Sequence, residues 1–154
     1  MKVNHSYGSK EKLFEMMQKV GGVINEDEVA DGFIPVDERM KIIKEFIKFV
    51  DEKLHLGDNM PNIIISYDEN EAKEMRSFGK NTPAAHEIRV VDKNRNLADT
   101  LRTLAHELKH TDQFVQGRLK PDSGDDGTEF ENEANAFSGV VMREFGRKNP
   151  IIFE

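Results

Sequence analysis

The chain contains no cysteine among its 154 residues. Disulfide bonds, thiolate zinc ligands and a cysteine-based zymogen switch are therefore excluded. A metal site in this protein has to be built from histidine, aspartate and glutamate. The chain has 5 histidines, which is enough for such a site.

Long apolar runs are also missing. No segment approaches the ~18 apolar residues that a membrane-spanning helix needs, so no membrane association is expected. The first residues, Met1 to Ser6, lack the apolar core of a signal peptide, which makes the cytoplasm the expected compartment. Packaging into a particle would leave the same signature in the sequence.

Excess positive charge is absent as well. The formal net charge is -7, so generic binding to nucleic-acid phosphates is not expected. The composition, 37% hydrophobic and 33% charged, is that of a globular protein without low-complexity tracts. We expect a single domain over 1–154, with a helical N-terminal part over 1–60 and a catalytic core over 61–147, and a monomer by default.

The spacing of apolar residues predicts the order of helices and strands. Residues three and four apart predict a helix after Asp37, and a short β-branched run after Pro61 predicts a strand. The full prediction is helices over 9–20, 37–54, 69–77, 97–116 and 128–147, strands over 62–67 and 86–91, and loops over 79–83 and 118–127. This order indicates an α+β fold, with helices around a small mixed or antiparallel sheet.

The most informative motif is His106-Glu107-Leu108-Lys109-His110, an H-E-x-x-H sequence inside a predicted helix. Residues i and i+4 share one face of a helix, so both imidazoles can bind one zinc ion. The glutamate beside the first histidine can then act as general base toward water. The alternative is an exposed helix that carries two surface histidines.

The motif helix is predicted to use two faces. Its apolar stripe consists of Leu97, Leu101, Leu104 and Leu108. On a helical wheel His106, His110 and Gln113 fall on the opposite side, so the histidines point away from the core and toward a cleft. Gln113 either orients a ligand or the adjacent loop, or it faces solvent.

Catalytic zinc usually has three protein ligands, so a third ligand is needed. The remaining histidines, His5, His55 and His86, all precede the motif. The following helix, over 128–147, carries several glutamates near its start. One of these carboxylates can complete a His-His-Glu site.

At this point the chain resembles a known group. H-E-x-x-H followed by a helix that carries E-x-x-A-[DN]-x-F is similar to the gluzincins, zinc metallopeptidases whose third ligand is a glutamate. The resemblance covers about residues 86–142 and is nearest to minigluzincins and ImmA/IrrE-like proteases. Small phage-encoded metallopeptidases resemble the chain in the same motif and following helix. The resemblance implies a minigluzincin-like fold and one zinc ion per chain.

Carried over residue by residue, the resemblance makes His106, His110 and Glu131 the zinc ligands and Glu107 the general base. It also implies that Asn135 accepts a hydrogen bond from a ligand histidine. Aspartate is commoner at that position. An amide can still accept from an imidazole N–H but adds no negative charge.

Two alternatives to Glu131 as a ligand stay open. Glu133 directly precedes Ala134, as the ligand does in some gluzincins. Glu131 can also serve as the N3 residue of a capping box that begins at Thr128. Glu131 is preferred because it forms an i, i+4 pair with Asn135.

Two further residues are candidates for substrate contact. In the resembling folds the strand before the motif helix is the sheet edge on which a peptide pairs, and His86 begins that strand. Tyr67 is a candidate for polarising a substrate carbonyl. For both residues a purely structural role at a strand end is the alternative.

These patterns favour a zinc-dependent endopeptidase that acts on a protein or peptide substrate. A metallopeptidase-like binding or regulatory module with little proteolysis is the alternative, although such a module has no need of Glu107. A purely structural zinc is a third reading. Structural sites usually have four protein ligands, often cysteines, which this chain does not contain.

Overall fold

The computed structural model describes residues 3–6, 34–68, 70–119 and 128–153. The helix predicted over 9–20 and residues 120–127 of the predicted loop lie outside these ranges. None of the helices described is long and apolar enough to cross a membrane.

The described elements form an α+β fold, which confirms the predicted class. In chain order they are β1 (Val3–Ser6), α2 (Val36–Leu54), β2 (Asn62–Ser66), α3 (Glu71–Met75), β3 (Gly79–Thr82), β4 (Glu87–Val91), α4 (Leu97–Val115) and α5 (Glu129–Lys148). Single 3-10 turns lie at η2 (Gly57–Asn59), η3 (Pro83–Ala85) and η4 (Pro150–Phe153).

The sheet has four strands in the order β1-β2-β4-β3. The first three are parallel, and β3 runs antiparallel to β4 at the edge. Two expectations are wrong here. The segment over 79–83 was expected to be a loop, yet Gly79–Thr82 is a strand, and the strand before the motif helix is internal instead of at the edge. The polar sequence of β3 has little strand propensity of its own, so its pairing with β4 decides its conformation.

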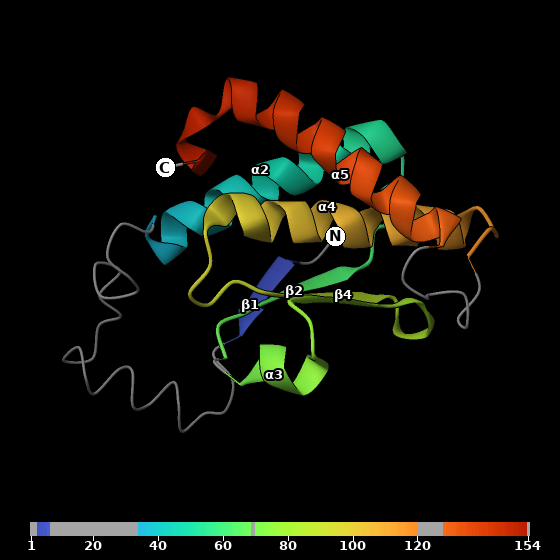
Figure 1. Cartoon of the computed structure of the whole chain (residues 1–154), viewed down its shortest axis with the longest axis horizontal. Coiled ribbons are helices and arrows are strands. Elements are labelled where there is room, and N and C mark those ends of the chain that lie inside the picture. The colour runs from blue at the N-terminus through green and yellow to red at the C-terminus, as the bar shows by residue number, and fades with distance from the viewer. Residues whose placement is uncertain (1–2, 7–33, 69, 120–127, 154) are drawn as a thin grey trace.

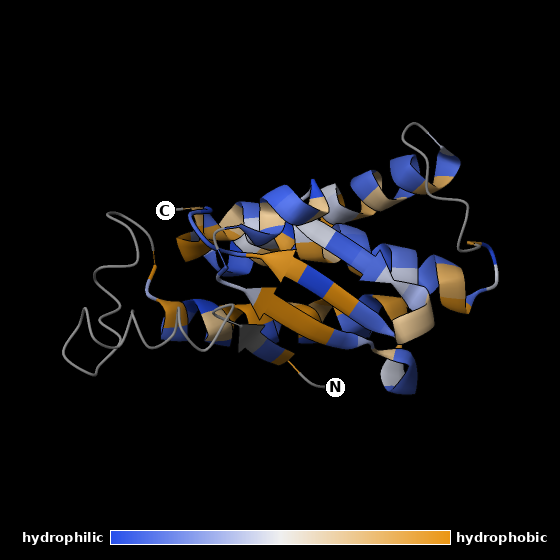
Figure 2. Cartoon of the chain, turned by 90° about the horizontal axis from the view of Figure 1, so that it is seen from below, coloured by the Kyte–Doolittle hydropathy of each residue, from blue (hydrophilic) through white to orange (hydrophobic). Residues whose placement is uncertain are grey.

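Figure 1 shows α2, α4 and α5 on one side of the sheet and α3 on the other. Figure 2 shows β2 apolar along most of its length, whereas β4 alternates between apolar and polar residues. The fully buried apolar strand residues are Ile63, Ile65, Ile88 and Val90. This alternation is typical of a sheet with one face packed on helices.

The leucine stripe of α4 forms the centre of the core, as predicted. Leu101, Leu104 and Leu108 have no exposed surface. From the other side Phe46 of α2 meets Phe145 of α5, with ring centroids 5.1 Å apart in an edge-to-face arrangement. The leucine face thus fixes α4 in the core. The opposite face, which carries His106 and His110, takes no part in the leucine packing.

Tyr67 belongs to a buried polar network and not to a cleft. Its hydroxyl donates to Asp92 Oδ2 at 2.8 Å, and the Nε of Arg39 donates to the same oxygen at 2.8 Å. Thr100 Oγ1 donates to Asp92 Oδ1 at 2.6 Å. This network ties α2 and the ends of β2 and β4 to the first turn of α4. The oxyanion role considered for Tyr67 is therefore replaced by a structural one.

Candidate metal centre

Helices α4 and α5 bring two histidines and one glutamate together. His110 Nε2 lies 2.8 Å from Glu131 Oε1, and His106 Nε2 lies 3.2 Å from Glu131 Oε2. The two Nε2 atoms are 3.0 Å apart. In the part of the chain that the structure describes, these residues are the group of metal-binding side chains whose ligand atoms all lie within 4.8 Å of one another.

The donor set fits a small divalent metal ion. Zn–N and Zn–O bonds of about 2.0–2.1 Å at tetrahedral angles place two ligand atoms about 3.3 Å apart. The two Nε2 atoms are 3.0 Å apart, and each lies 2.8 or 3.2 Å from a different oxygen of Glu131, which is close to that value. Two imidazole nitrogens and one carboxylate oxygen suit zinc better than magnesium or calcium, which prefer oxygen ligands. The cluster can hold a metal ion.

The geometry separates Glu131 from its neighbour Glu133. The carboxylate of Glu133 accepts from Arg118 at 2.8 and 2.7 Å and lies 3.6 Å from Lys109 Nζ. The hydrogen bonds from Arg118 are the main cause that lowers the pKa of Glu133 to about 2. The carboxylate of Glu133 thus pairs with Arg118 and Lys109, whereas the carboxylate of Glu131 faces the two histidines.

The capping role considered for Glu131 at the start of α5 does not conflict with its place in the cluster. Thr128 Oγ1 accepts from the backbone N–H of Glu131 at 3.3 Å and so caps α5. This cap uses the backbone of Glu131. The carboxylate of Glu131 points to His106 and His110 instead of returning to the helix start, so cap and cluster coexist.

Each of the two histidines has a polar neighbour that is not a candidate metal ligand. His110 Nδ1 lies 2.8 Å from Gln113 Oε1. Asn135 lines the same cavity as His106, and its hydrogen bond to a ligand histidine stays a prediction. Burial and the neighbouring His110 lower the pKa of His106, while Glu131 and Asn135 act in the opposite direction. A lowered pKa favours the neutral imidazole, which is the form that binds metal.

Glu107 lies on the flank of the cluster, against the edge strand. A Cβ added to Gly79 would stand 2.5 Å from Thr103 Cγ2 and 3.3 Å from Glu107 Cγ, so only glycine lets β3 pass this close. Burial raises the pKa of Glu107 to about 7, with a further rise from Glu131 and an opposing effect of His110. A carboxyl group with this pKa can both take and return a proton near neutral pH.

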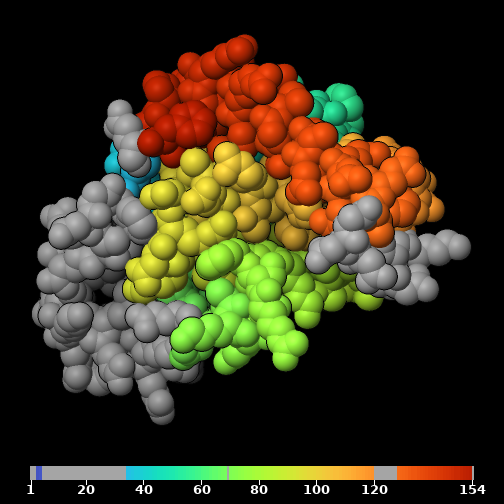
Figure 3. All heavy atoms as spheres, viewed as in Figure 1, coloured from blue at the N-terminus to red at the C-terminus, as the bar shows by residue number. Residues whose placement is uncertain are grey.

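A cavity of about 290 Å³ opens onto His106 and Glu107. Its walls come from Phe78 and Gly79 at the start of β3 and from Ser138 on α5. In Figure 3 the atoms of α5 (orange to red) lie directly on those of α4 (yellow). The cluster is thus reached from the side of the edge strand.

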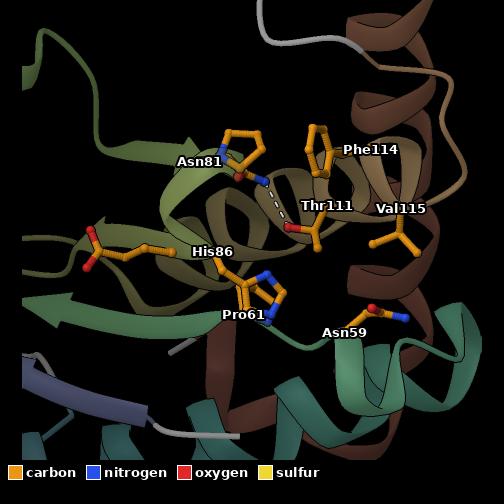
Figure 4. Close-up of a pocket in the computed structure, with 9 residues that line it drawn as sticks. Asn59, Pro61, Asn81, His86, Thr111, Phe114 and Val115 are labelled. Carbon is orange, nitrogen blue, oxygen red and sulfur yellow. Dashed lines mark hydrogen bonds between the residues drawn. The ribbon is translucent and has the colours of Figure 1, made fainter.

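Asn81 was missed by the sequence analysis, because its segment was read as a loop. Its Nδ2 donates to the carbonyl of Glu107 at 2.9 Å and to Thr111 Oγ1 at 2.8 Å. Figure 4 shows the second of these bonds. The two bonds fasten the edge strand to the helix that carries Glu107. No local pattern marks this contact, since it joins residues 26 and 30 positions apart.

His86 lies at a separate cavity of about 260 Å³, near the carboxyl end of α4. Figure 4 shows it together with Pro61, Asn59 and Phe114. His86 has a left-handed φ of 54° and precedes β4 instead of beginning it. It is not part of the metal-binding cluster, and its contact with substrate stays a prediction.

Comparison of the chain with family models, with curated proteins and with solved structures finds no match. The resemblance to gluzincins therefore stays an expectation. What favours a function is the arrangement of Glu107 beside His106, His110 and Glu131.

Proposed function

We propose that this protein is a zinc-dependent endopeptidase. The observation that carries the proposal is the position of Glu107 beside the three-residue cluster and next to an open sheet edge. A binding module or a structural metal site has no need of a carboxylate at that position. The metal-ligand chemistry, with two imidazoles and one carboxylate, supports zinc.

Each residue then has a distinct role. His106, His110 and Glu131 hold the zinc ion. Bound zinc supplies Lewis acidity, which makes water a nucleophile at neutral pH and polarises a carbonyl group. Glu107 takes a proton from the attacking water and passes it to the amine that leaves. Asn135, which lines the same cavity, is the candidate for orienting His106 through a hydrogen bond.

The edge strand offers a path for the substrate. The carbonyl of Phe78 accepts from the N–H of Val91 at 2.8 Å, so this pair is hydrogen-bonded within the sheet. Bonded and non-bonded pairs alternate in antiparallel strands, which turns the N–H and C=O groups of Asn81 outward. The corresponding groups of Gly79 are already hydrogen-bonded to the hydroxyl of Ser77. An extended peptide can pair with the outward groups of Asn81. Because the side chain of Asn81 is bonded to the carbonyl of Glu107, a peptide paired with Asn81 would run alongside the helix that carries the general base.

The test combines metal content with turnover on a library of quenched fluorescent peptides. We expect the zinc-loaded wild type to cleave a subset of peptides. Glu107→Gln should keep about one zinc per chain and lose turnover by a factor on the order of 10²–10⁴, the typical contribution of a general base. Glu144→Gln is the matched control, because Glu144 is a glutamate of α5 that pairs with Lys53 outside the cluster.

Two outcomes would overturn the proposal. Unchanged turnover in the Glu107→Gln variant would remove Glu107 from the mechanism. Zinc bound at the cluster without cleavage of any peptide would instead favour a metallopeptidase-like binding module.

A further inference from the structure

Gln113 is the buried polar side chain in closest contact with the cluster outside its ligands. It has no exposed surface, which is unusual for an amide. Its Oε1 lies 2.8 Å from His110 Nδ1. Its Nε2 donates to the carbonyl of Phe130 at 3.1 Å and to Glu133 Oε1 at 3.3 Å.

These contacts settle where the proton of His110 resides. A backbone carbonyl can only accept, so the amide nitrogen of Gln113 must face Phe130. The amide oxygen then faces His110, and an oxygen acceptor requires a proton on Nδ1. In the neutral ring the lone pair is therefore on Nε2, the atom that lies 2.8 Å from Glu131 Oε1.

The same side chain joins the two helices of the site. Phe130 and Glu133 flank Glu131 on α5, and both are held by one amide group that projects from α4. The first turn of α5 is thus fixed at the level of His110. A shift of this turn would carry the carboxylate of Glu131 away from both histidines.

We propose that Gln113 is a positioning residue of the metal centre, which holds His110 in its Nδ1–H tautomer and holds Glu131 against Nε2. The proposal rests on the metal-binding part of the proposed function and is independent of proteolysis. It does not require any contact of Gln113 with substrate or metal.

Two substitutions separate the two contacts. Gln113→Met keeps an unbranched side chain of similar length but neither accepts nor donates as an amide does. Gln113→Glu keeps an acceptor for His110 and loses the donor to Phe130. Gln116→Met is the matched control, because Gln116 lies on the same stretch of chain and bonds only Asp112 and the exposed Arg118.

The first measurement is the ¹⁵N shift of the His110 ring nitrogens in the metal-free full chain. We expect the Nδ1–H form in the wild type, in Gln113→Glu and in Gln116→Met, and a mixture of tautomers in Gln113→Met. The second measurement is zinc affinity by competition with a chelator. Loss of a partner of this kind lowers metal affinity about 10–100-fold, so we expect that loss in Gln113→Met and no change in Gln116→Met.

Three results would overturn the proposal. These are an Nε2–H tautomer in the wild type, an unchanged tautomer in folded Gln113→Met, and an unchanged zinc affinity in that variant. If Gln113→Met does not fold, the wild-type tautomer and its retention in Gln113→Glu decide the question. If the wild type binds no zinc, the proposed function fails, while the tautomer measurement still tests the role of Gln113.

Discussion

Two polar clusters of this molecule differ in how their charges are balanced. Around Asp92 the donors converge on one buried carboxylate, from Arg39, Tyr67 and Thr100. At the other cluster, two imidazole nitrogens converge on the carboxylate of Glu131 with separations of 2.8 and 3.2 Å.

In the first cluster the carboxylate of Asp92 is surrounded by N–H and O–H donors, so its hydrogen-bonding capacity is satisfied. In the second, a neutral His110 with its proton on Nδ1 presents its Nε2 lone pair toward the carboxylate of Glu131, so two acceptors face each other. Only a cation or a proton makes that arrangement favourable. The comparison teaches that burial and hydrogen bonding mark a structural network, whereas converging acceptors mark a metal site. Four predictions test this difference, in order of decreasing effect on the free energy of unfolding.

The largest effect is expected at the network around Asp92. Asp92→Ala removes the carboxylate that pairs with the buried guanidinium of Arg39, and the two side chains are only 0–3% exposed. Breaking a buried pair in this way costs about 3–5 kcal/mol. Urea denaturation monitored by circular dichroism measures the loss. A variant as stable as the wild type would show that the network is not structural.

Metal loading is expected to have the next largest effect. Zinc at 100 times its dissociation constant stabilises a protein by about 2.7 kcal/mol when it binds the native state alone. We expect this gain in the wild type and in Glu133→Ala, and its loss in Glu131→Ala. Thermal unfolding with and without zinc measures it. An equal gain in Glu131→Ala would assign the metal to other residues.

The third prediction concerns pH in the metal-free protein. Because the pKa of Glu107 is about 7 in the fold, the native state binds a proton that the unfolded chain releases near pH 4.5. Stability should therefore fall as the pH rises from about 4.5 to about 7, by about 2.5 kcal/mol.

Glu107→Gln should remove this fall. The lowered pKa of His106 acts in the opposite direction, but it does so in both proteins. The difference between their stability curves thus isolates Glu107. Parallel curves from pH 4 to pH 8 would contradict the prediction.

The smallest effect is expected at the exposed pair of Glu133 and Arg118. The pKa of Glu133 is lowered to about 2, so its contribution is present above pH 4.5 and disappears as the pH falls toward 2. Because the pair is exposed and screened by salt, the effect on stability is small. An NMR titration of the Glu133 carboxyl measures this pKa. An ordinary value near 4.5 would show that Glu133 is not paired with Arg118 and so does not differ from Glu131 in the way described.

Several features were predictable because they depend on local spacing. The leucine stripe of α4 and the opposite placement of His106 and His110 follow from the helical repeat alone. The strand over 62–66 and the helices α2, α4 and α5 were predicted within one or two residues at most ends. Gly79–Thr82 was not, because a polar strand is formed by its partner and not by its own residues.

The sequence by itself determined that a helix would carry two histidines on the face opposite its leucines, with a glutamate on the flank beside them. It also limited any metal site to His, Asp and Glu, because cysteine is absent. The tertiary structure alone decided that Glu131 lies at the histidines while Glu133 lies at Arg118. Local spacing favoured Glu131 through its i, i+4 pair with Asn135 but left Glu133 open. The packing of α5 on α4, with Lys109 on α4 and Arg118 just after it, decides between them. The same packing buries Gln113 beside His110, because contacts between distant segments are set by the three-dimensional arrangement and not by the local repeat.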